Sequence, residues 1–269
     1  MRELERHPDT PLAPVAASMR LAVVGQGRLG SALATALRGS EGPAVSEALG
    51  HDADLTGYDA ILLCVPDSAI KAAAATVPAG RLVGHCSGAS GLALLGPHEA
   101  FSLHPLMTFA HGDGPARFVG AGAAIAGSTP RAVTFARTLA QRLQMESFEL
   151  AEADRTAYHA AASIASNFLV GLEATAERLA AGTGLRRELL VPLVRATVEN
   201  WSTLGAERAL TGPIARGDER TVSHQREAVA ARTPELLEMF DAMVAVTRGV
   251  ARAGAAGLAP ASPAPAVPA

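Results

Sequence analysis

The sequence is poor in cysteine and carries no excess of positive charge. It has two cysteines in 269 residues, Cys64 and Cys86, in apolar stretches without a C-x-x-C pair or a histidine cluster at metal-ligand spacing. We expect both to be reduced packing residues and predict no metal site. The formal net charge of −3 at pH 7 excludes a strongly basic surface, so we expect no nucleic-acid or membrane partner.

Long apolar runs are missing as well. Residues 1–18 mix charges and prolines without the apolar core of a signal peptide, and no later run approaches the ~20 apolar residues of a membrane span. We therefore expect a cytoplasmic protein. Lysine is nearly absent too, because Lys71 is the single lysine among 23 basic residues.

Length and hydrophobicity predict two domains. With 49% hydrophobic residues, the chain can form two cores of ordinary size. Strand signals alternate with helical ones up to residue 150, and helical periodicity continues alone after it. We predict a flexible leader at 1–18, a dinucleotide-binding domain at 19–150, a helical substrate and dimerisation domain at 151–254 and a disordered Ala/Pro tail at 255–269.

The stretch from Leu21 to Gly30 has the order strand, glycine turn, helix. Its first four residues are apolar, three glycines follow at G-x-G-x-x-G spacing, and leucines then recur every four residues. Gly25 would turn the chain off the strand, Gly27 would let backbone N–H groups approach a pyrophosphate, and Gly30 would let the helix pack closely. The helix dipole would favour the phosphates. A purely structural turn is the alternative. The predicted cofactor-binding residues are Gly25, Gln26, Gly27, Arg28, Leu29, Gly30 and, at the next confident strand exit, Val65 and Pro66.

Further strands are expected near residues 44–48, 59–67, 81–86, 100–104, 122–126 and 146–150, with helices at 68–76 and 130–143. This alternation predicts an α/β fold, with an N-terminal doubly wound, Rossmann-type parallel sheet followed by a smaller all-helical domain. Ligands of such sheets lie beyond the carboxyl ends of the strands. Polar residues at strand exits are therefore candidates for chemistry.

Two polar side chains mark these exits. His104 ends the strand at 100–104 and precedes Pro105, and Ser87 follows the strand at 81–86. His104 would donate a hydrogen bond to a substrate, or would be satisfied by loop carbonyls. Ser87 would bind cofactor or substrate, or would cap the turn before Gly88.

The C-terminal half predicts helices at 154–181, 189–204, 218–232 and 234–252. Asp218 suits the N-cap of the third helix, and Thr233 with its following proline suits the start of the fourth. Apolar positions such as Leu189, Leu193 and Ala196 exceed what one short bundle is expected to cover. We therefore predict a homodimer through this domain.

The first of these helices carries four polar residues on one side of an apolar sequence. At 100° per residue, Ser163, Ser166 and Asn167 fall within 80° of His159. This strip would face a substrate, or would serve interhelical hydrogen bonds or simple exposure. A later loop at 209–218 carries Thr211 and Arg216. Arg216 would hold a substrate carboxylate in bidentate fashion, or would pair with Asp218 in solvent.

Several motifs together resemble one family, over roughly residues 19 to 253: Gly25-Gln26-Gly27-Arg28-Leu29-Gly30, Val65-Pro66-Asp67, His85-Cys86-Ser87-Gly88-Ala89, His104-Pro105-Leu106, Tyr158-His159-Ala160-Ala161 with Ser166-Asn167, and 210–218. The family is a group of Rossmann-like proteins whose helical C-terminal domain was long catalogued as a domain of unknown function. Some members are described as an alternative type of ketopantoate (2-dehydropantoate) reductase. The resemblance implies NADPH-dependent reduction in pantothenate synthesis.

A more distant resemblance connects the layout to pyrroline-5-carboxylate reductase and prephenate dehydrogenase. The segment at His104 is similar to a His-Pro-Met substrate loop in the latter. One departure is clear, because the common ketopantoate reductases use a lysine on the first helix of the C-terminal domain, whereas Lys71 lies in the nucleotide domain. If this chain reduces ketopantoate, other groups must polarise the carbonyl.

The residues alone leave the cofactor type open. Glu47 is 22 positions past Gly25, near where an acid would favour NAD through the ribose hydroxyls. Arg28 or Ser46 would instead receive the 2′-phosphate of NADP. The family resemblance favours NADP, with NAD as the alternative.

Three functional classes follow: a 2-oxo acid reductase, an imine reductase or related oxidoreductase, and a nucleotide-binding regulator without turnover. For the first, the cofactor supplies the hydride, and the protein orients a small substrate, stabilises an alkoxide and delivers a proton. We predict His159 as the acid, Asn167 as the group polarising the carbonyl and His104 as a substrate-holding residue. The remaining predicted substrate-binding residues are Ser87, Ser163, Ser166, Thr211 and Arg216.

Overall fold

The computed structural model describes residues 19–110 and 112–257, which divide between two compact units, Met1–Ser166 and Asn167–Ala269. The predicted boundary at 150/151 lies just after the last strand, which ends at Glu149. The first unit continues to Ser166 because a helix after that strand packs on the sheet through the buried Arg155. The predicted leader at 1–18 and the tail from 258 onward lie outside the described residues. Residues 255–257, predicted as part of the tail, are helical.

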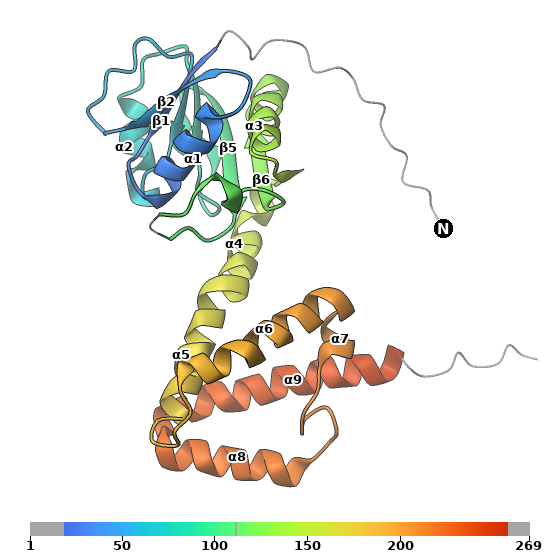
Figure 1. Cartoon of the computed structure of the whole chain (residues 1–269). Coiled ribbons are helices and arrows are strands. Elements are labelled where there is room, and N and C mark those ends of the chain that lie inside the picture. Colours follow the sequence, from blue (N-terminus) through green and yellow to red (C-terminus); the bar gives the residue numbers. More distant parts are fainter. Residues whose placement is uncertain (1–18, 111, 258–269) are drawn as a thin grey trace, which may run out of the picture. The chain divides into compact units, whose positions relative to one another are not determined.

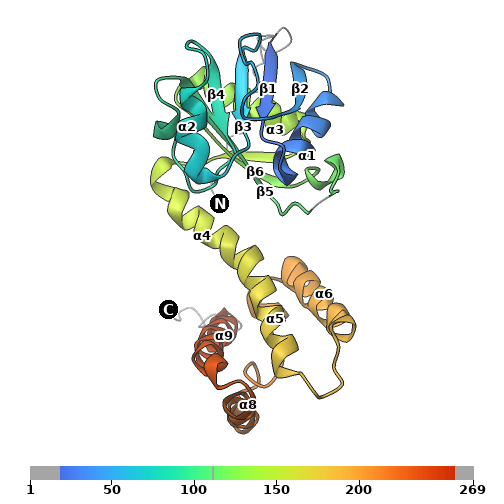
Figure 2. The ribbon, with the colours of Figure 1, turned by 90° about the vertical axis from the view of Figure 1, so that its left-hand side faces the viewer.

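The first unit contains a seven-stranded sheet in the order β2-β1-β3-β4-β5-β6-β7. Figure 1 labels β1, β2, β5 and β6 of this sheet. Figure 2 shows β4, β3, β1 and β2 side by side. Because β2 and β3 lie on opposite sides of β1, the strand order reverses there, which is where ligands bind in such folds. The strands are β1 (Arg20–Val24), β2 (Ala44–Leu49), β3 (Ala60–Leu63), β4 (Leu82–His85), β5 (Glu99–Leu106), β6 (Gly122–Gly127) and β7 (Glu146–Glu149).

The Rossmann-type fold is confirmed, with one correction to the predicted parallel sheet. β6 runs antiparallel to β5, whereas β1 to β5 are mutually parallel and β7 is parallel to β6. In its described residues, the connection from β5 to β6 contains a single short turn of helix, η3 (Pro115–Arg117). A parallel neighbour needs a long crossover, whereas an antiparallel one does not. This connection therefore returns the chain in the opposite direction.

Helices cover both faces of the sheet because its side chains alternate between two apolar clusters. Leu21 and Leu62 pack with α1 (Arg28–Arg38) and α3 (Pro130–Arg142). Ala22 and Ile61 face the opposite side, with α2 (Ile70–Ala75) and η2 (Leu92–Leu95). Full burial of such a leucine or isoleucine stabilises the fold by about 1.5–3 kcal/mol. The short η1 (Asp67–Ala69) leads into α2.

The helix predicted at 154–181 is interrupted. It consists of η4 (Glu152–Asp154), α4 (Arg155–Ser163), a π-helical turn η5 (Ile164–Phe168) and α5 (Leu169–Leu179). A π turn holds one residue more than an α turn. Residues after Ser163 are therefore rotated by roughly 100° from their predicted positions around the helix.

All described secondary structure of the second unit is helical. Asp218 caps α8, as predicted, by accepting a hydrogen bond from the backbone N–H of Thr221 at 3.1 Å. No helix in the described ranges is long and apolar enough to span a membrane. The helices after α5 are α6 (Arg187–Leu204), α7 (Ala206–Ala209), α8 (Glu219–Arg232), η6 (Pro234–Leu236) and α9 (Leu237–Gly257).

Candidate functional site

The glycine turn after β1 has the backbone geometry that its sequence predicts. Gly25 has φ +126°, and a Cβ on it would lie 2.2 Å from the carbonyl oxygen of Cys64. A Cβ on Gly30 would lie 1.9 Å from the carbonyl oxygen of Gly25. Gly27 differs, because no atom lies within 4 Å of its Cβ position. Gly25 and Gly30 therefore close the turn, whereas Gly27 borders open space at the start of α1.

A pocket of about 460 Å³ opens at this turn. The first-turn N–H groups of α1 have no intrahelical acceptor and carry the positive end of the helix dipole, so the pocket suits an anionic group such as a pyrophosphate. Six of the eight predicted cofactor residues line it: Gly27, Arg28, Leu29, Gly30, Val65 and Pro66. Gly25 lies within the turn, and the Gln26 amide donates to the Ala48 carbonyl at 3.3 Å.

Four further residues that were not predicted from the sequence line the same pocket: Cys64, Asp67, Cys86 and Phe109. Asp67 directly follows the predicted Pro66, and Cys86 directly precedes the predicted Ser87. Extending each strand exit by one residue would have found both. Phe109 reaches the pocket from the loop after β5 and packs against Phe118, with ring centroids 5.0 Å apart. No sequence signal pointed to Phe109.

Ser87 caps its turn, which is one of the two roles considered for it. Its hydroxyl donates to Asp67 Oδ2 at 2.7 Å and accepts from the N–H groups of Ala89 at 3.2 Å and Ser90 at 2.9 Å. It also lines the pocket while remaining buried. Ser87 therefore fixes the loop after β4 and holds the Asp67 carboxylate at the edge of the pocket.

His104 lies inside β5 rather than at its end, two residues beyond Ser102, which pairs with His85 of β4. Its imidazole packs over Gly88, because a Cβ there would lie 2.9 Å from the ring. The structure thus brings His104 next to the loop that carries Ser87. β5 extends past the end of β4 at this point, so His104 stands at the level of the β4 exit as predicted for the ligand edge.

Tyr158 of α4 is the partner of His104. Its hydroxyl lies 2.6 Å from His104 Nδ1, and the two rings meet edge to face. Burial, with a smaller contribution from the charge of His159, lowers the pKa of His104 to about 4. Burial raises the pKa of Tyr158 to about 12. Both groups are therefore uncharged near neutral pH, and one proton lies between them.

Buried polar contacts hold α4 in place. Arg155 is 3% exposed and donates to Glu152 Oε2 at 2.9 Å and to Ser102 Oγ on β5 at 2.9 Å. A Cβ on Gly91 would lie 1.8 Å from Glu152 Oε1, so the loop after β4 packs against the same carboxylate. Tyr158 lies one helical turn beyond Arg155. This anchoring therefore sets the position of the His104–Tyr158 pair.

His85 is a second imidazole near this pair, and it is fully buried. Its Nδ1 accepts the N–H of Ser87 at 3.2 Å. Burial, and then the nearby Arg155 charge, lowers its pKa to about 4. His85 is therefore neutral and supports the loop that carries Ser87.

Only part of the polar strip predicted on the first long helix lies on one face of α4. His159 is exposed and Ser163 half-buried on α4. Ser166 and Asn167 lie in the π turn, so the rotation there moves them from the predicted common face. The Ser166 hydroxyl donates to the Ala162 carbonyl of its own helix at 2.7 Å. Asn167 begins the second unit.

Thr211 and Arg216 lie exposed on the second unit, in the loop between α7 and α8. Within the described residues, Arg216 forms no ion pair with Asp218. The Asp218 carboxylate instead accepts from the Thr221 hydroxyl at 2.7 Å, and the hydrogen bonds with Thr221 lower its pKa. The substrate roles of Asn167, Thr211 and Arg216 remain predictions.

The structure does not support two of the residues that were considered for contacting the cofactor ribose or its 2′-phosphate. β2 continues to Leu49, so Ser46 and Glu47 both lie inside the strand. Ser46 Oγ accepts the N–H of Val23 at 3.1 Å, and Glu47 pairs with Arg38 at 3.1 Å. The Ser46 hydroxyl is therefore already hydrogen-bonded within the sheet, and Glu47 does not lie at the end of the strand. Arg28 remains at the pocket.

Comparison with known proteins found one matching family model and several solved structures that are similar to this chain. Residues 122–247 match a family model described as a domain of unknown function (DUF2520), and no curated protein matches the chain. A Bacteroides fragilis protein named as a candidate NADP oxidoreductase has a similar structure, with 17% identity, 86% of this chain and 98% of that chain covered, and a TM-score of 0.73.

Two further solved structures are similar. A Thermotoga maritima protein has 24% identity, 87% and 98% coverage and a TM-score of 0.71. Plasmodium falciparum pyrroline carboxylate reductase with NADP bound has 12% identity, 88% and 99% coverage and a TM-score of 0.53. At these identities the likeness shows that this chain shares their fold, a Rossmann-type sheet followed by helices.

Proposed function

We propose that this chain is an NADP(H)-dependent oxidoreductase that reduces a small 2-oxo acid, with 2-dehydropantoate as the first substrate to test. The observation that carries the proposal is the pocket at Gly27, where the amino end of α1 meets the exits of β3 and β4. Arg28 at this pocket supplies a cation for a 2′-phosphate, which supports NADP over NAD. The names of the Bacteroides fragilis and Plasmodium falciparum proteins, each including NADP, support the same cofactor.

The residues of the first unit fit the remaining tasks of such a reduction. The hydride comes from the reduced nicotinamide when the cofactor is bound. A hydrogen bond donated by the Tyr158 hydroxyl to His104 Nδ1 would fix the imidazole tautomer with the proton on Nε2. His104 then holds the substrate through a neutral N–H donor, since a pKa of about 4 keeps it from acting as a cationic acid near pH 7. His159, exposed on the same helix as Tyr158, delivers the proton.

Imine reduction is the second candidate. It is supported by the fold shared with pyrroline carboxylate reductase, which extends over 88% of this chain. A C=N substrate needs the same hydride and the same proton delivery. The two candidates therefore differ in the substrate rather than in the residues of the first unit.

A substrate panel tests the proposal. NADPH oxidation is followed with 2-dehydropantoate, other 2-oxo acids and pyrroline-5-carboxylate as separate substrates. Turnover of a 2-oxo acid supports the leading proposal, and turnover of the imine alone supports the second. NADPH binding without turnover of any member would instead indicate a nucleotide-binding regulator.

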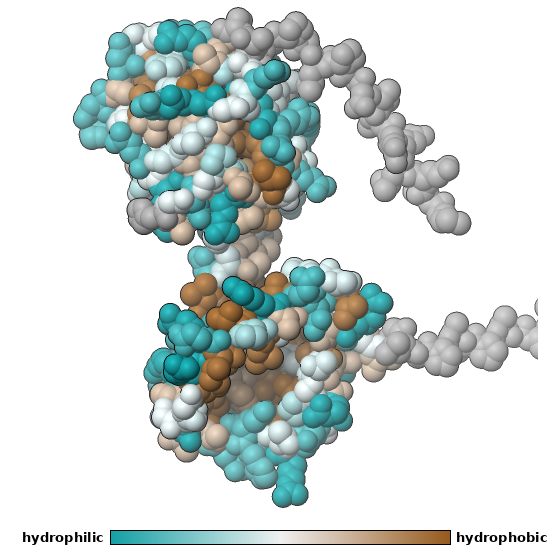
Figure 3. Space-filling view, in the orientation of Figure 1, coloured by the Kyte–Doolittle hydropathy of each residue, from teal (hydrophilic) through white to brown (hydrophobic). Residues whose placement is uncertain are grey.

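The second unit supports assembly as a homodimer. Among its described residues, four side chains are buried: Val222, Val229, Thr233 and Val244. Large apolar side chains remain exposed, including Leu189 at 56%, Leu193 at 64% and Trp201 at 59%. Figure 3 shows hydrophobic residues gathered on the exposed surface of this unit. Such a surface is typical of a protein interface, and a second copy of the chain is the proposed partner.

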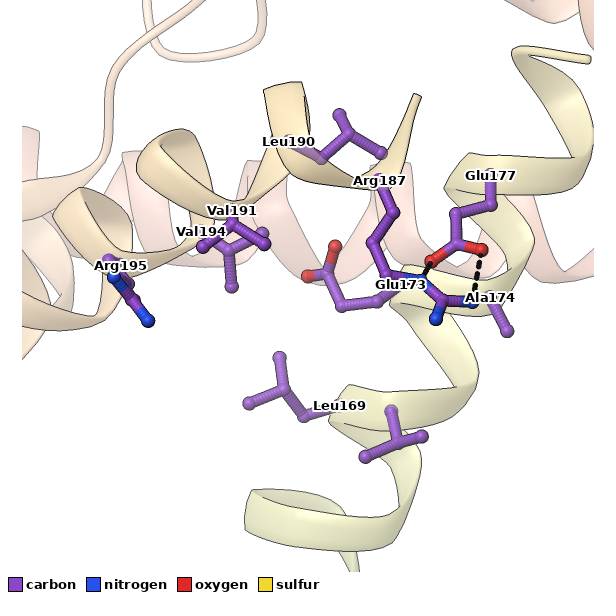
Figure 4. Close-up of a pocket in the computed structure, with 10 residues that line it drawn as sticks. Leu169, Glu173, Ala174, Glu177, Arg187, Leu190, Val191, Val194 and Arg195 are labelled. Atoms are coloured by element: carbon purple, nitrogen blue, oxygen red, sulfur yellow. Dashed lines mark hydrogen bonds and ion pairs between the residues drawn. The ribbon is translucent and has the colours of Figure 1, made fainter. Parts of the chain in front are cut away.

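A groove between α5 and α6 belongs to this apolar surface. It has a volume of about 540 Å³. Figure 4 shows Leu169 of α5 and Val191 and Val194 of α6 beside one space, next to the ion pair of Arg187 with Glu177. Its apolar lining and charged edge resemble the core and rim of an interface.

A further inference from the structure

The two cysteines of the chain form a pair at the candidate nucleotide pocket. Their Sγ atoms lie 3.7 Å apart, and both thiols are free. Leu63 of β3 pairs with His85 of β4, so Cys64 and Cys86 follow at equivalent positions on neighbouring parallel strands. Both residues line the pocket bounded by Gly27. This arrangement places a dithiol where a bound nucleotide would cover it.

The backbone geometry permits a disulfide at this place. Neighbouring strands lie about 4.7–4.9 Å apart, which is within the ~4.4–6.8 Å between Cα atoms that disulfides require. The two sulfur atoms must approach by about 1.7 Å to reach a bond length near 2.05 Å. Side-chain rotation with a small backbone shift can supply this movement.

We propose that Cys64 and Cys86 are a peroxide-sensitive dithiol whose oxidation weakens nucleotide binding; the second part rests on the proposed function. The Cys64 thiol loses its proton, and the thiolate attacks hydrogen peroxide, so that an S–O bond forms, the O–O bond breaks and hydroxide leaves, which takes up that proton to become water. The Cys86 thiol then attacks the sulfenic sulfur, the S–S bond forms, the S–O bond breaks and a second water leaves. Two thiols and one peroxide thus give one disulfide and two waters.

Burial decides the order of the two steps. Cys64 is half-buried and Cys86 is 8% exposed. The hydrogen bond with Cys64, together with burial, raises the pKa of the Cys86 thiol. Cys64 is therefore the thiol that meets peroxide, and Cys86 resolves the sulfenic acid.

The glycine turn couples this bond to the pocket. A Cβ on Gly25 would lie 2.2 Å from the Cys64 carbonyl oxygen, and one on Gly30 would lie 3.1 Å from Cys64 Cβ. Since the turn packs directly on Cys64, a shift of Cys64 toward Cys86 displaces the turn. The N–H groups at the start of α1 then lose their alignment for a pyrophosphate.

Thiol labelling tests the proposal without any nucleotide. The reduced full-length chain is treated with hydrogen peroxide, denatured and labelled with N-ethylmaleimide, and the labels are counted by intact mass. We expect two labels before treatment and none after it, with a monomer on a non-reducing gel and both labels restored by dithiothreitol. Retained labels, or a mass gain of oxygen atoms without a disulfide, would overturn the dithiol.

NADPH binding is then measured by fluorescence on the reduced and oxidised chain. We expect at least ~10-fold weaker binding after oxidation, and slower disulfide formation when NADPH is present. Cys64→Ser, which keeps the buried Cys86, should show equal NADPH affinity before and after peroxide. A disulfide that leaves affinity unchanged would overturn the coupling. Absence of NADPH binding by the reduced chain would refute the proposed function, while the label count still decides on the dithiol.

Discussion

His104 and Tyr158 lie 54 positions apart in the sequence, yet their side chains share one hydrogen bond. Tyr158→Phe removes the hydroxyl that holds the His104 tautomer. We expect KM for the reduced substrate to rise by roughly 3- to 10-fold, the value of one hydrogen bond, with less change in kcat and none in NADPH affinity.

Tyr58→Phe provides the matched control for that substitution. Tyr58 is the other tyrosine of the chain, and its ring packs under Arg20 in the first unit, away from the His104 pair. Steady-state kinetics give the KM of each variant for the reduced substrate, and the two values are compared. Equal KM values in both would show that the Tyr158 hydroxyl does not position His104.

The lowered pKa values of two imidazoles predict a specific dependence of stability on pH. His85 and His104 have pKa values of about 4 in the folded chain, against 6.5 for an ordinary histidine. Between these values the unfolded chain binds protons that the folded chain does not. The free energy of unfolding should therefore fall as pH drops from about 6.5 to 4, by up to ~3 kcal/mol for each histidine.

Urea unfolding between pH 7.5 and 4.5 measures this dependence. In His85→Asn the side-chain oxygen can still accept a hydrogen bond from the Ser87 N–H. The fall in the free energy of unfolding on acidification should be smaller than in the wild type, by the contribution of one histidine. His51→Asn is the control, since the His51 side chain is 89% exposed. Identical pH dependence in the wild type and His85→Asn would contradict a neutral, buried His85.

Residue roles set by the local backbone could be predicted from the sequence, whereas those set by distant partners could not. The spacing of Gly25, Gly27 and Gly30 indicated the turn because each role depends on backbone close by. Nothing in the sequence near His104 indicated Tyr158 as its partner. Ser87 left two roles open because its acceptor, Asp67, is 20 positions away.

At the scale of elements, the π turn between α4 and α5 separates residues that an ideal helix would align. His159 lies before this turn and Ser166 within it. His159→Ala should lower kcat by at least ~100-fold with NADPH affinity intact, as expected for loss of a general acid. Ser166→Ala should stay within a few-fold of the wild type.

Single-turnover and steady-state rates compare these two variants directly. His104→Ala serves as the third arm, with its effect expected mainly in KM. If His159→Ala kept nearly full kcat while His104→Ala lost it, the acid would be His104. A large loss in Ser166→Ala would show that the π turn does not separate the two residues functionally.

Strand existence was predictable, but strand direction was not. Short apolar runs that alternate with helical stretches predicted each strand of the sheet near its observed position. The antiparallel course of β6 depends on the connection at 107–121, whose described residues, all but 111, form no crossover helix. Its absence was the available signal, because apolar periodicity is the same for both directions of a strand.

In the whole molecule, few side chains of the helical unit are buried, and large apolar side chains remain on its surface. Leu193 on α6 is 64% exposed, so Leu193→Glu costs the isolated chain little. At an interface, however, it would bury a charge. We expect the wild type to be a dimer and Leu193→Glu a monomer by light scattering at micromolar concentration.

Ala231→Glu supplies the control for added charge, because Ala231 is an exposed helical position on α8. It should remain dimeric. A monomeric wild type, or dissociation of both variants alike, would contradict the proposed interface on α5 and α6.

The glycine turn is proposed to bind NADPH, and the single substitution Gly27→Asp tests this binding. Gly27 has φ −72° and open space at its Cβ, so aspartate fits there without strain and suits a helix N-cap. Its carboxylate would repel the pyrophosphate. Gly114→Asp is the matched control, since Gly114 has φ −98°, open space at its Cβ and no place in the pocket. In a fluorescence titration, we expect NADPH to bind the wild type and Gly114→Asp equally and Gly27→Asp at least ~10-fold more weakly. Equal NADPH affinity in all three proteins would show that the glycine turn does not bind the cofactor.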